Sequence, residues 1–218
     1  MYIVKTPWWL RALYPSLIWR LPAAEKVIYL TFDDGPHEIA TPFVLDVLKQ
    51  YNAKATFFCI GKNVLQHAEI YAQVIAEGHA VGNHTAHHAN GWKVDDEKYM
   101  QEITEAAECI HSNLFRPPYG RIKRSQIKQL QKRANNNSTL QSTKLPFKII
   151  MWDILSGDFD VTLGKEVCYK NVVSNTVPGA IIVFHDSAKA WDRLSYALPL
   201  VMEYFTKKGY RFEAIQFK

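Results

Sequence analysis

Two adjacent carboxylates, Asp33 and Asp34, follow an apolar run of β-branched and aromatic residues at 26–30. Such a run is typical of a buried strand, and the Gly-Pro pair at 35–36 ends any strand there. Parallel α/β folds place their sites at the carboxyl ends of strands, so both acids are expected at such an edge. Because neighbouring like charges cost energy unless a cation or a proton separates their roles, the pair is a candidate for catalysis. An ordinary Asp-Gly-Pro turn is the alternative interpretation.

Two histidines four residues apart, His84 and His88, are candidate partners of these acids. If their turn is helical, their Cβ atoms lie about 5–6 Å apart, close enough for both rings to bind one ion. Two imidazoles and one carboxylate, from Asp33 or Asp34, leave an open coordination position, as catalytic metal sites require. The other aspartate can then act as general base on a metal-activated water. A chance pair of surface histidines is the alternative, and His87 is expected to point elsewhere.

His185 follows another apolar run, at 180–184, and from the end of that strand it could protonate a leaving group. Asp158 could fix the tautomer and orientation of the His185 ring, with Asp153 as the alternative orienting residue. Arg116 ends a short strand and could form a bidentate pair with an acid of the first strand. The structural alternatives are a half-buried histidine at a strand end, solvated aspartates and a salt bridge unrelated to catalysis.

The elements that must position these residues alternate along the chain. Strands are expected at 26–30, 55–60, 80–81, 114–115, 148–152, 180–184 and 211–217. Helices are expected at 39–51, 63–77, 95–111, 125–133, 164–174 and 194–207. Asn63 is the expected cap of the second helix, and Pro199 is expected to kink the last one. Strands that alternate with helices indicate a parallel sheet with right-handed crossovers.

Polar motifs after successive strands favour an α/β fold, a distorted (β/α)7-type barrel with a mostly parallel sheet. A length of 218 residues, 48% hydrophobic and 22% charged, fits one globular domain. We predict that residues 1–25 form an N-terminal extension packing on the barrel, and that residues 26–218 form the domain that carries the site. The polar stretch at 135–143 is expected to be a surface loop.

The net charge of +5 fits an acidic partner, such as cell-wall polymer, a membrane surface or nucleic acid. The basic residues cluster only at 121–133, where six Lys and Arg occur without interleaved aromatic residues. We interpret that segment as a solvated helix face and predict no nucleic-acid binding. Cys59, Cys109 and Cys168 show no paired spacing, so we expect buried thiols rather than disulfides.

The N-terminus is apolar and aromatic but interrupted by Lys5, Pro7, Arg11 and Pro15. It has no continuous apolar region followed by a small-residue cleavage site, so we predict no signal peptide and no transmembrane segment. A lid packed over the barrel end is favoured over an interfacial membrane anchor, because two arginines are too few for a basic amphipathic face.

Taken together, these segments resemble a known family. Segments 31–36, 84–88, 116–120, 152–159 and 183–186 occur in the order of the five motifs of polysaccharide deacetylases, carbohydrate esterase family 4 with the NodB-homology domain. The resemblance covers about residues 26–217. It implies a distorted (β/α) barrel and removal of N-acetyl, sometimes O-acetyl, groups from polymers of N-acetylglucosamine or related sugars, such as peptidoglycan or chitooligosaccharides.

The resemblance also implies roles for the matching residues. Asp33 resembles the general base of the family. Asp34, His84 and His88 resemble the ligands of a divalent metal, usually zinc, with cobalt or nickel as the alternatives. Arg116 matches the arginine that pairs with the base.

Further roles follow from the later motifs. His185 resembles the general acid and Asp158 the carboxylate that tunes it, while Tyr119 matches the residue whose backbone N–H helps to hold the oxyanion. Phe159 stands where the family often has Trp, and Val183 where it usually has Leu. Both would line the acetyl pocket or groove, so these two departures leave the chemistry intact and bear on substrate choice.

We therefore predict a metal-dependent carbohydrate deacetylase whose partner is an acetylated polysaccharide or oligosaccharide. The rival functions are an O-acetyl esterase acting on xylan-like glycans and a glycan-binding pseudoenzyme. A binding protein needs no acid and base, which argues against the second rival. A cell-wall substrate would place the protein in the cell envelope or periplasm. The sequence predicts no oligomeric state.

Overall fold

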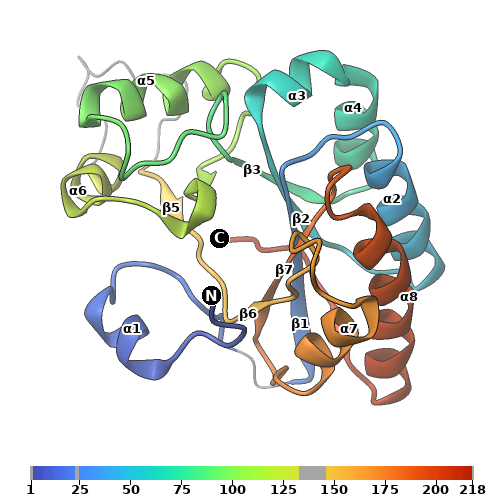
Figure 1. Cartoon of the computed structure of the whole chain (residues 1–218). Helices are drawn as coiled ribbons and strands as arrows, with labels where there is room; N and C mark the ends of the chain where they lie inside the picture. The colour runs from blue at the N-terminus through green and yellow to red at the C-terminus, as the bar shows by residue number, and fades with distance from the viewer. Residues whose placement is uncertain (1, 23–24, 133–145, 218) are drawn as a thin grey trace.

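The computed structural model describes residues 2–22, 25–132 and 146–217, and a curled parallel sheet lies at its centre (Figure 1). The strand order is β5-β4-β3-β2-β1-β7-β6, and β8 pairs with β1 beside that path. The strands are β1 (Val27–Asp33), β2 (Thr56–Cys59), β3 (Ala80–Asn83), β4 (Leu114–Phe115), β5 (Lys148–Ile149), β6 (Ile154–Leu155), β7 (Ile181–His185) and β8 (Arg211–Phe212). All these pairings are parallel, which confirms the predicted (β/α)7-type barrel.

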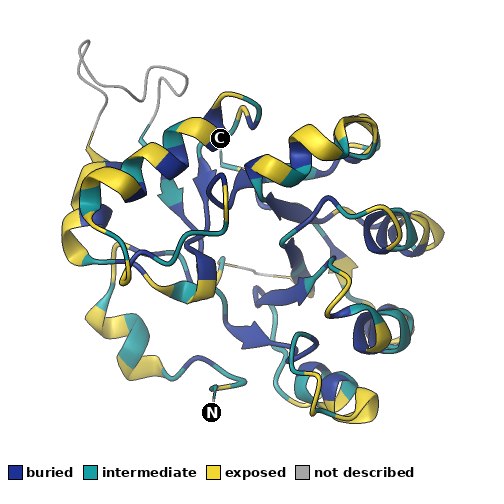
Figure 2. Cartoon of the chain, turned by 45° about the horizontal axis from the view of Figure 1, so that its top comes forward, coloured by how far each residue is buried: buried dark blue, intermediate teal, exposed yellow. Residues whose placement is uncertain are grey.

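Helices surround the sheet, and Figure 2 shows their exposed faces turned outward from the buried strands. The α-helices are α1 (Trp8–Leu13), α2 (Ala40–Gln50), α3 (Gly61–Gln66), α4 (Ala68–Ala76), α5 (Asp96–Ala107), α6 (Arg124–Gln131), α7 (Lys165–Val173) and α8 (Trp191–Lys207). A short 3-10 helix, η1 (Pro118–Gly120), follows β4. Strand β1 pairs with β2, β7 and β8, and all but one of its residues are buried, as is typical of continuous apolar strands in parallel sheets.

Several predicted boundaries were wrong. The helix expected over 63–77 is two helices, α3 and α4, because His67 has a non-helical backbone (φ −125°, ψ 48°). Asn63 lies inside α3, where its side chain donates to the Asp34 carbonyl at 2.7 Å instead of capping a helix. Helix α5 ends four residues early, at Ala107, and α8 begins three residues early, at Trp191. Pro199 lies inside α8, and the kink expected there stays a prediction.

The strands near the C-terminal end of the chain are shorter than expected. β5 and β8 have two residues each, and β6, also two residues long, was not predicted. A two-residue strand carries too little periodicity to be recognised. The loop expected at 135–143 lies outside the described residues. The three cysteines are free, as expected. Cys59 and Cys168 are buried as predicted, whereas Cys109 is only partly buried.

Residues 2–22 run along the side of the barrel between β5 and β6, the first and last strands of the strand order. Isolated bridges join Lys5 to Ile154 of β6 and Ile18 to Ile150, which directly follows β5. The division of the chain at residue 25 remains a prediction. Among the described residues, no helix is both long and apolar enough to cross a membrane.

Candidate active site

The register of the sheet brings the candidate residues together at the carboxyl ends of neighbouring strands. Asp33, the last residue of β1, lies beside His185, the last residue of β7. Asn83, the last residue of β3, pairs with Phe115 of β4, so that the next residues, His84 and Arg116, are neighbours. Residues between 32 and 152 positions apart in the sequence therefore meet at one edge of the sheet.

Asp34, His84 and His88 form the candidate metal site. One ligand atom from each lies within 4.8 Å of the others. Nε2 of His88 is 3.2 Å and Nε2 of His84 is 3.7 Å from Oδ1 of Asp34. His84 and His88 lie in a turn that is not helical, and Thr85 and His88 in this turn have positive φ angles of 65° and 59°. The two histidines therefore converge without the helical turn that the sequence suggested.

Contacts at Nδ1 orient the rings of His84 and His88 so that Nε2 of each faces Asp34. His84 donates from Nδ1 to the Arg116 carbonyl at 2.7 Å, which leaves a lone pair on Nε2. His88 Nδ1 lies 3.1 Å from the Tyr119 hydroxyl. His87 points away as predicted and contacts Glu102.

The protonation states of His84 and Asp34 suit the binding of a cation. Burial lowers the pKa of His84 to about 4, so this ring is neutral at pH 7, as a metal ligand must be. Burial alone would raise the pKa of Asp34, but the contact with His88 and the charge of His185 outweigh burial and hold this pKa well below its usual range. Oδ1 of Asp34 is buried and has no hydrogen-bond partner among the described residues. A buried acceptor between two imidazole nitrogens is an arrangement that a divalent ion satisfies.

Arg116 pairs with Asp33 through one nitrogen, not through the bidentate contact considered from the sequence. Its Nη1 donates to Oδ1 of Asp33 at 2.6 Å and to Oγ1 of Thr31 at 2.7 Å. The remaining guanidinium nitrogens donate to the carbonyls of Ile150 and Met151. Burial lowers the pKa of Arg116, and Asp33 opposes that effect. The arginine is held rigidly, and one oxygen of Asp33 is left for other partners.

Asp158 is the partner of His185. Nδ1 of His185 donates to Oδ1 of Asp158 at 2.7 Å, and the His185 backbone N–H donates to Oδ2 at 2.7 Å. Burial would lower the pKa of His185, but Asp158 outweighs burial and raises the pKa to about 9. His185 is therefore protonated at neutral pH. The alternative orienting residue, Asp153, is instead 3.7 Å from Arg11.

The residues expected beside the substrate occupy different environments. Tyr119 has a positive φ of 60° and is exposed, with its ring centroid 4.5 Å from that of His88. Phe159 packs edge-on against His185, with ring centroids 5.2 Å apart, and its ring also contacts Tyr2. Val183 is buried within β7, two residues before His185. Their roles toward substrate remain predictions.

Sequence reasoning gave no role to Asp186, a buried carboxylate next to the site. Its Oδ1 accepts from the Gly35 N–H at 3.1 Å, and its Oδ2 accepts from Oγ1 of Thr41 at 2.5 Å. Burial and the nearby Asp34 raise the pKa of Asp186 to about 8. Asp186 thereby ties the loop after β1 to the first turn of α2. Its position directly after His185 was the available signal.

Comparison with known proteins identifies the family. The family model described as polysaccharide deacetylase matches residues 20–137, more than half of the chain. The chain belongs to the polysaccharide deacetylase family. A peptidoglycan-N-acetylglucosamine deacetylase of Bacillus cereus is 33% identical over 204 residues, which cover 90% of each chain. A chitooligosaccharide deacetylase of Azorhizobium caulinodans is 29% identical over 79% of this chain and 82% of its own.

Solved structures of polysaccharide deacetylases share the fold. A crystal structure of a peptidoglycan N-acetylglucosamine deacetylase, in complex with 4-naphthalen-1-yl-N-oxidanyl-benzamide, superposes with a TM-score of 0.82 at 30% identity. The match covers 96% of this chain and 95% of the other. Members of this carbohydrate esterase family depend on a metal, which agrees with the Asp34, His84 and His88 cluster.

Proposed function

We propose that this polysaccharide deacetylase is a hydrolase that removes N-acetyl groups from a polysaccharide containing N-acetylglucosamine, of the peptidoglycan or chitooligosaccharide type. The main support for this proposal is that a proton donor and a proton acceptor are neighbours in the site. A protonated His185 and a carboxylate, Asp33, lie side by side at the strand ends, beside a three-ligand cluster. An acid and a base on either side of a metal site are what amide hydrolysis requires.

Asp34, His84 and His88 would hold the ion. Two imidazole nitrogens and one carboxylate oxygen suit zinc, and also cobalt or nickel. We propose zinc as the natural ion. A bound divalent ion would polarise the acetyl carbonyl and lower the pKa of the attacking water.

The chain's own residues carry the proton transfers. Asp33 takes a proton from water as the water oxygen attacks the acetyl carbon. Arg116 holds Asp33 in place through a hydrogen bond from Nη1 to Oδ1 at 2.6 Å. The Tyr119 backbone N–H donates to the carbonyl oxygen as negative charge develops there. His185, fixed by Asp158, gives its Nε2 proton to the sugar nitrogen as the C–N bond breaks, and the products are acetate and a free amine.

The test is acetate release from peptidoglycan fragments, chitooligosaccharides and acetylxylan, after chelation and again after addition of zinc. We expect release from N-acetylated substrates that disappears on chelation and returns with zinc. Release from acetylxylan alone would assign the protein as an O-acetyl esterase. Binding of glycan without acetate release would assign it as a binding protein. A cell-wall substrate would further place the protein in the cell envelope or periplasm, which fractionation of cells would test.

A further inference from the structure

The N-terminal segment exposes large apolar side chains that the fold does not use. Ile3 is 55%, Trp8 75%, Trp9 49% and Leu13 55% exposed. These are four of the eleven exposed large hydrophobic residues in the described part of the chain, and they fall within eleven consecutive positions. Helix α1 has no buried residue at all. Single exposed apolar residues are normal, but a cluster of this kind marks an interaction surface.

This segment is held in place on both sides of α1. The Thr6 N–H donates to the Asp153 carbonyl at 2.8 Å, and the Ile18 N–H donates to the Ile149 carbonyl at 2.9 Å. After α1, the Trp19 indole N–H donates to the Tyr14 carbonyl. Because the chain is tied down before and after α1, the exposure of Trp8 and Leu13 is a property of the folded surface.

Helix α6 lies beside the end of this segment, as Figures 1 and 2 show. The Arg124 guanidinium lies 5.5 Å from the centre of the Tyr14 ring, and Gln131 donates to the Ser16 carbonyl at 2.8 Å. Lys128 is one turn beyond Arg124, so both basic side chains lie on the side of α6 that meets residues 14–16. Arg124 and Lys128 are exposed and have no ion-pair partner within the described ranges.

Neither of these two segments contains an acidic residue of its own. Residues 2–22 contain three Lys or Arg and no Asp or Glu. Residues 109–132 contain six Lys or Arg and no Asp or Glu, and one of the six, Arg116, is buried in the active site. Asp153 lies 3.7 Å from Arg11 and Asp96 of α5 lies 3.8 Å from Lys123, whereas Arg124 and Lys128 pair with no acid among the described residues. The basic amphipathic character that the N-terminus lacks on its own is thus supplied by α6.

We propose that Ile3, Trp8, Trp9 and Leu13, together with Arg124 and Lys128, form a face that binds the surface of an anionic lipid bilayer. The apolar and aromatic side chains enter the boundary between headgroups and acyl chains, and the basic side chains contact anionic headgroups. An anionic polymer without sugar rings or other apolar groups would use the charges and leave the tryptophans in water. A second copy of the chain would bring the unpaired Arg124 and Lys128 of two molecules together, and these like charges repel each other.

The experiment measures co-sedimentation of the full chain with vesicles of phosphatidylcholine, with and without phosphatidylglycerol. We expect binding to the anionic vesicles that weakens as salt is raised. Trp8→Ala with Leu13→Ala should weaken binding at least about tenfold, because buried apolar area is lost. Arg124→Gln with Lys128→Gln should weaken it about ten- to thirtyfold, because each basic group near an anionic surface contributes about fivefold. Both pairs are exposed, and unchanged thermal unfolding checks that the fold is intact.

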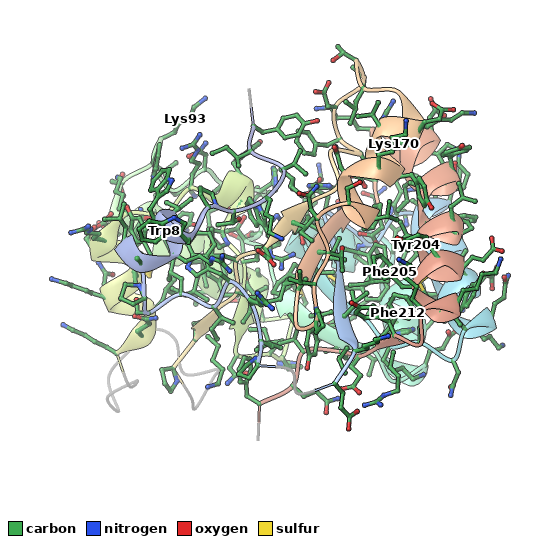
Figure 3. All side chains as sticks on the ribbon, turned by 90° about the horizontal axis from the view of Figure 1, so that it is seen from below. Trp8, Lys93, Lys170, Tyr204, Phe205 and Phe212 are labelled. Carbon is green, nitrogen blue, oxygen red and sulfur yellow. The ribbon has the colours of Figure 1, made fainter. Side chains whose placement is uncertain are left out.

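Matched controls lie on other parts of the surface. Leu65→Ala removes an equally exposed apolar side chain from α3, and Lys170→Gln removes a charge from α7. Figure 3 shows Lys170 and Trp8 on opposite sides of the molecule. Both control variants should bind anionic vesicles like the parent protein.

Three outcomes would overturn the proposal. The first is no binding to anionic vesicles. The second is binding that the Trp8 and Leu13 changes leave intact, which would assign the face to an anionic polymer. The third is a dimer, detected by light scattering, that dissociates in the Leu13→Ala variant. This result would assign the face to contact with a second copy of the chain. None of these outcomes depends on whether acetate is released.

Discussion

The backbone carbonyl of Arg116 accepts a hydrogen bond from Nδ1 of His84 at 2.7 Å, while the side chain of the same arginine binds Asp33. One residue therefore orients both a candidate metal ligand and the candidate base. The guanidinium is fully buried, lies 4.1 Å from the Phe58 ring and donates to two backbone carbonyls. A lysine has neither the planar shape nor the number of donors to replace it.

We expect Arg116→Lys to lower the free energy of unfolding by about 3–5 kcal/mol and to reduce turnover strongly, because buried polar partners lose their donors. Denaturant unfolding and acetate release measure the two effects. Arg121→Lys is the control, since Arg121 is exposed beside Trp92, and it should change stability little. Near-parental stability of Arg116→Lys would contradict this account.

Asp33→Asn should separate the candidate base from the candidate metal ligands. Asn keeps the size of the side chain but cannot accept the proton, so the rate should fall about 10²- to 10⁴-fold. Metal content should stay at the parental value, because Asp33 lies outside the three-ligand cluster. Elemental analysis and acetate release are the measurements. Retained turnover would remove Asp33 from the role of base.

His84→Ala and Asp34→Ala should lose metal and activity together. Each removes one of three ligands, and the loss of a ligand weakens metal affinity directly. His87→Ala is the matched control, since His87 contacts Glu102 outside the cluster and should keep both metal and rate. Full metal occupancy in the His84 and Asp34 variants would disprove the ligand assignment.

The sequence could predict the candidate site because its residues follow strands, and strand ends in a parallel sheet meet at one edge. Asp33, His84, Arg116 and His185 were found in that way. The role of Asp186 could not be predicted, because it depends on a contact with Gly35 across 151 positions. Local patterns show which residues end strands and do not show which buried carboxylate packs on which loop.

The same limit applies to the N-terminal segment. Its own sequence carries too few basic residues for a membrane-binding face, and this led to the prediction of a lid. Only the packing of Tyr14 against Arg124 shows that α6 supplies further charge. A surface that is formed by two segments far apart in the sequence cannot be predicted from the sequence of either segment alone.

The alkaline limit of activity should report the pKa of His185. As general acid His185 must be protonated, so kcat/KM should fall as pH rises through about 9. Asp158→Asn removes the largest cause that raises this pKa, and the fall should move to lower pH. Asp160→Asn is the control, because Asp160 is bonded to Thr162, and its profile should match the parent. An unmoved alkaline limit in Asp158→Asn would contradict the pairing.

The same pKa also makes stability depend on pH. The pKa of His185 is raised from 6.5 to about 9 in the folded state, so the folded protein binds the proton more tightly than the unfolded chain does. The resulting stabilisation is complete below pH 6.5 and is lost as pH rises through 9. Unfolding free energies across this range, in the parent and in His185→Gln, should show a smaller loss in the variant.

Gly35→Ala should distort the loop that carries Asp33 and Asp34. A Cβ at this position would lie 2.0 Å from Oδ2 of the buried Asp186, so one group must move. Overpacking of this kind costs about 1–3 kcal/mol of unfolding free energy, and displacement of the two aspartates should also reduce turnover. Gly164→Ala is the control, since its nearest neighbour would be 3.6 Å away.

A double substitution identifies the cause of that loss. If the clash with Asp186 is responsible, then Gly35→Ala should cost less stability in an Asp186→Ala background than in the parent, because the smaller side chain leaves room for the added methyl group. The difference between the two costs is the coupling energy of the pair. Additive costs would mean that Gly35 is required for another reason. Restored stability without restored turnover would show that Asp186 holds the loop in its active geometry as well as filling the space.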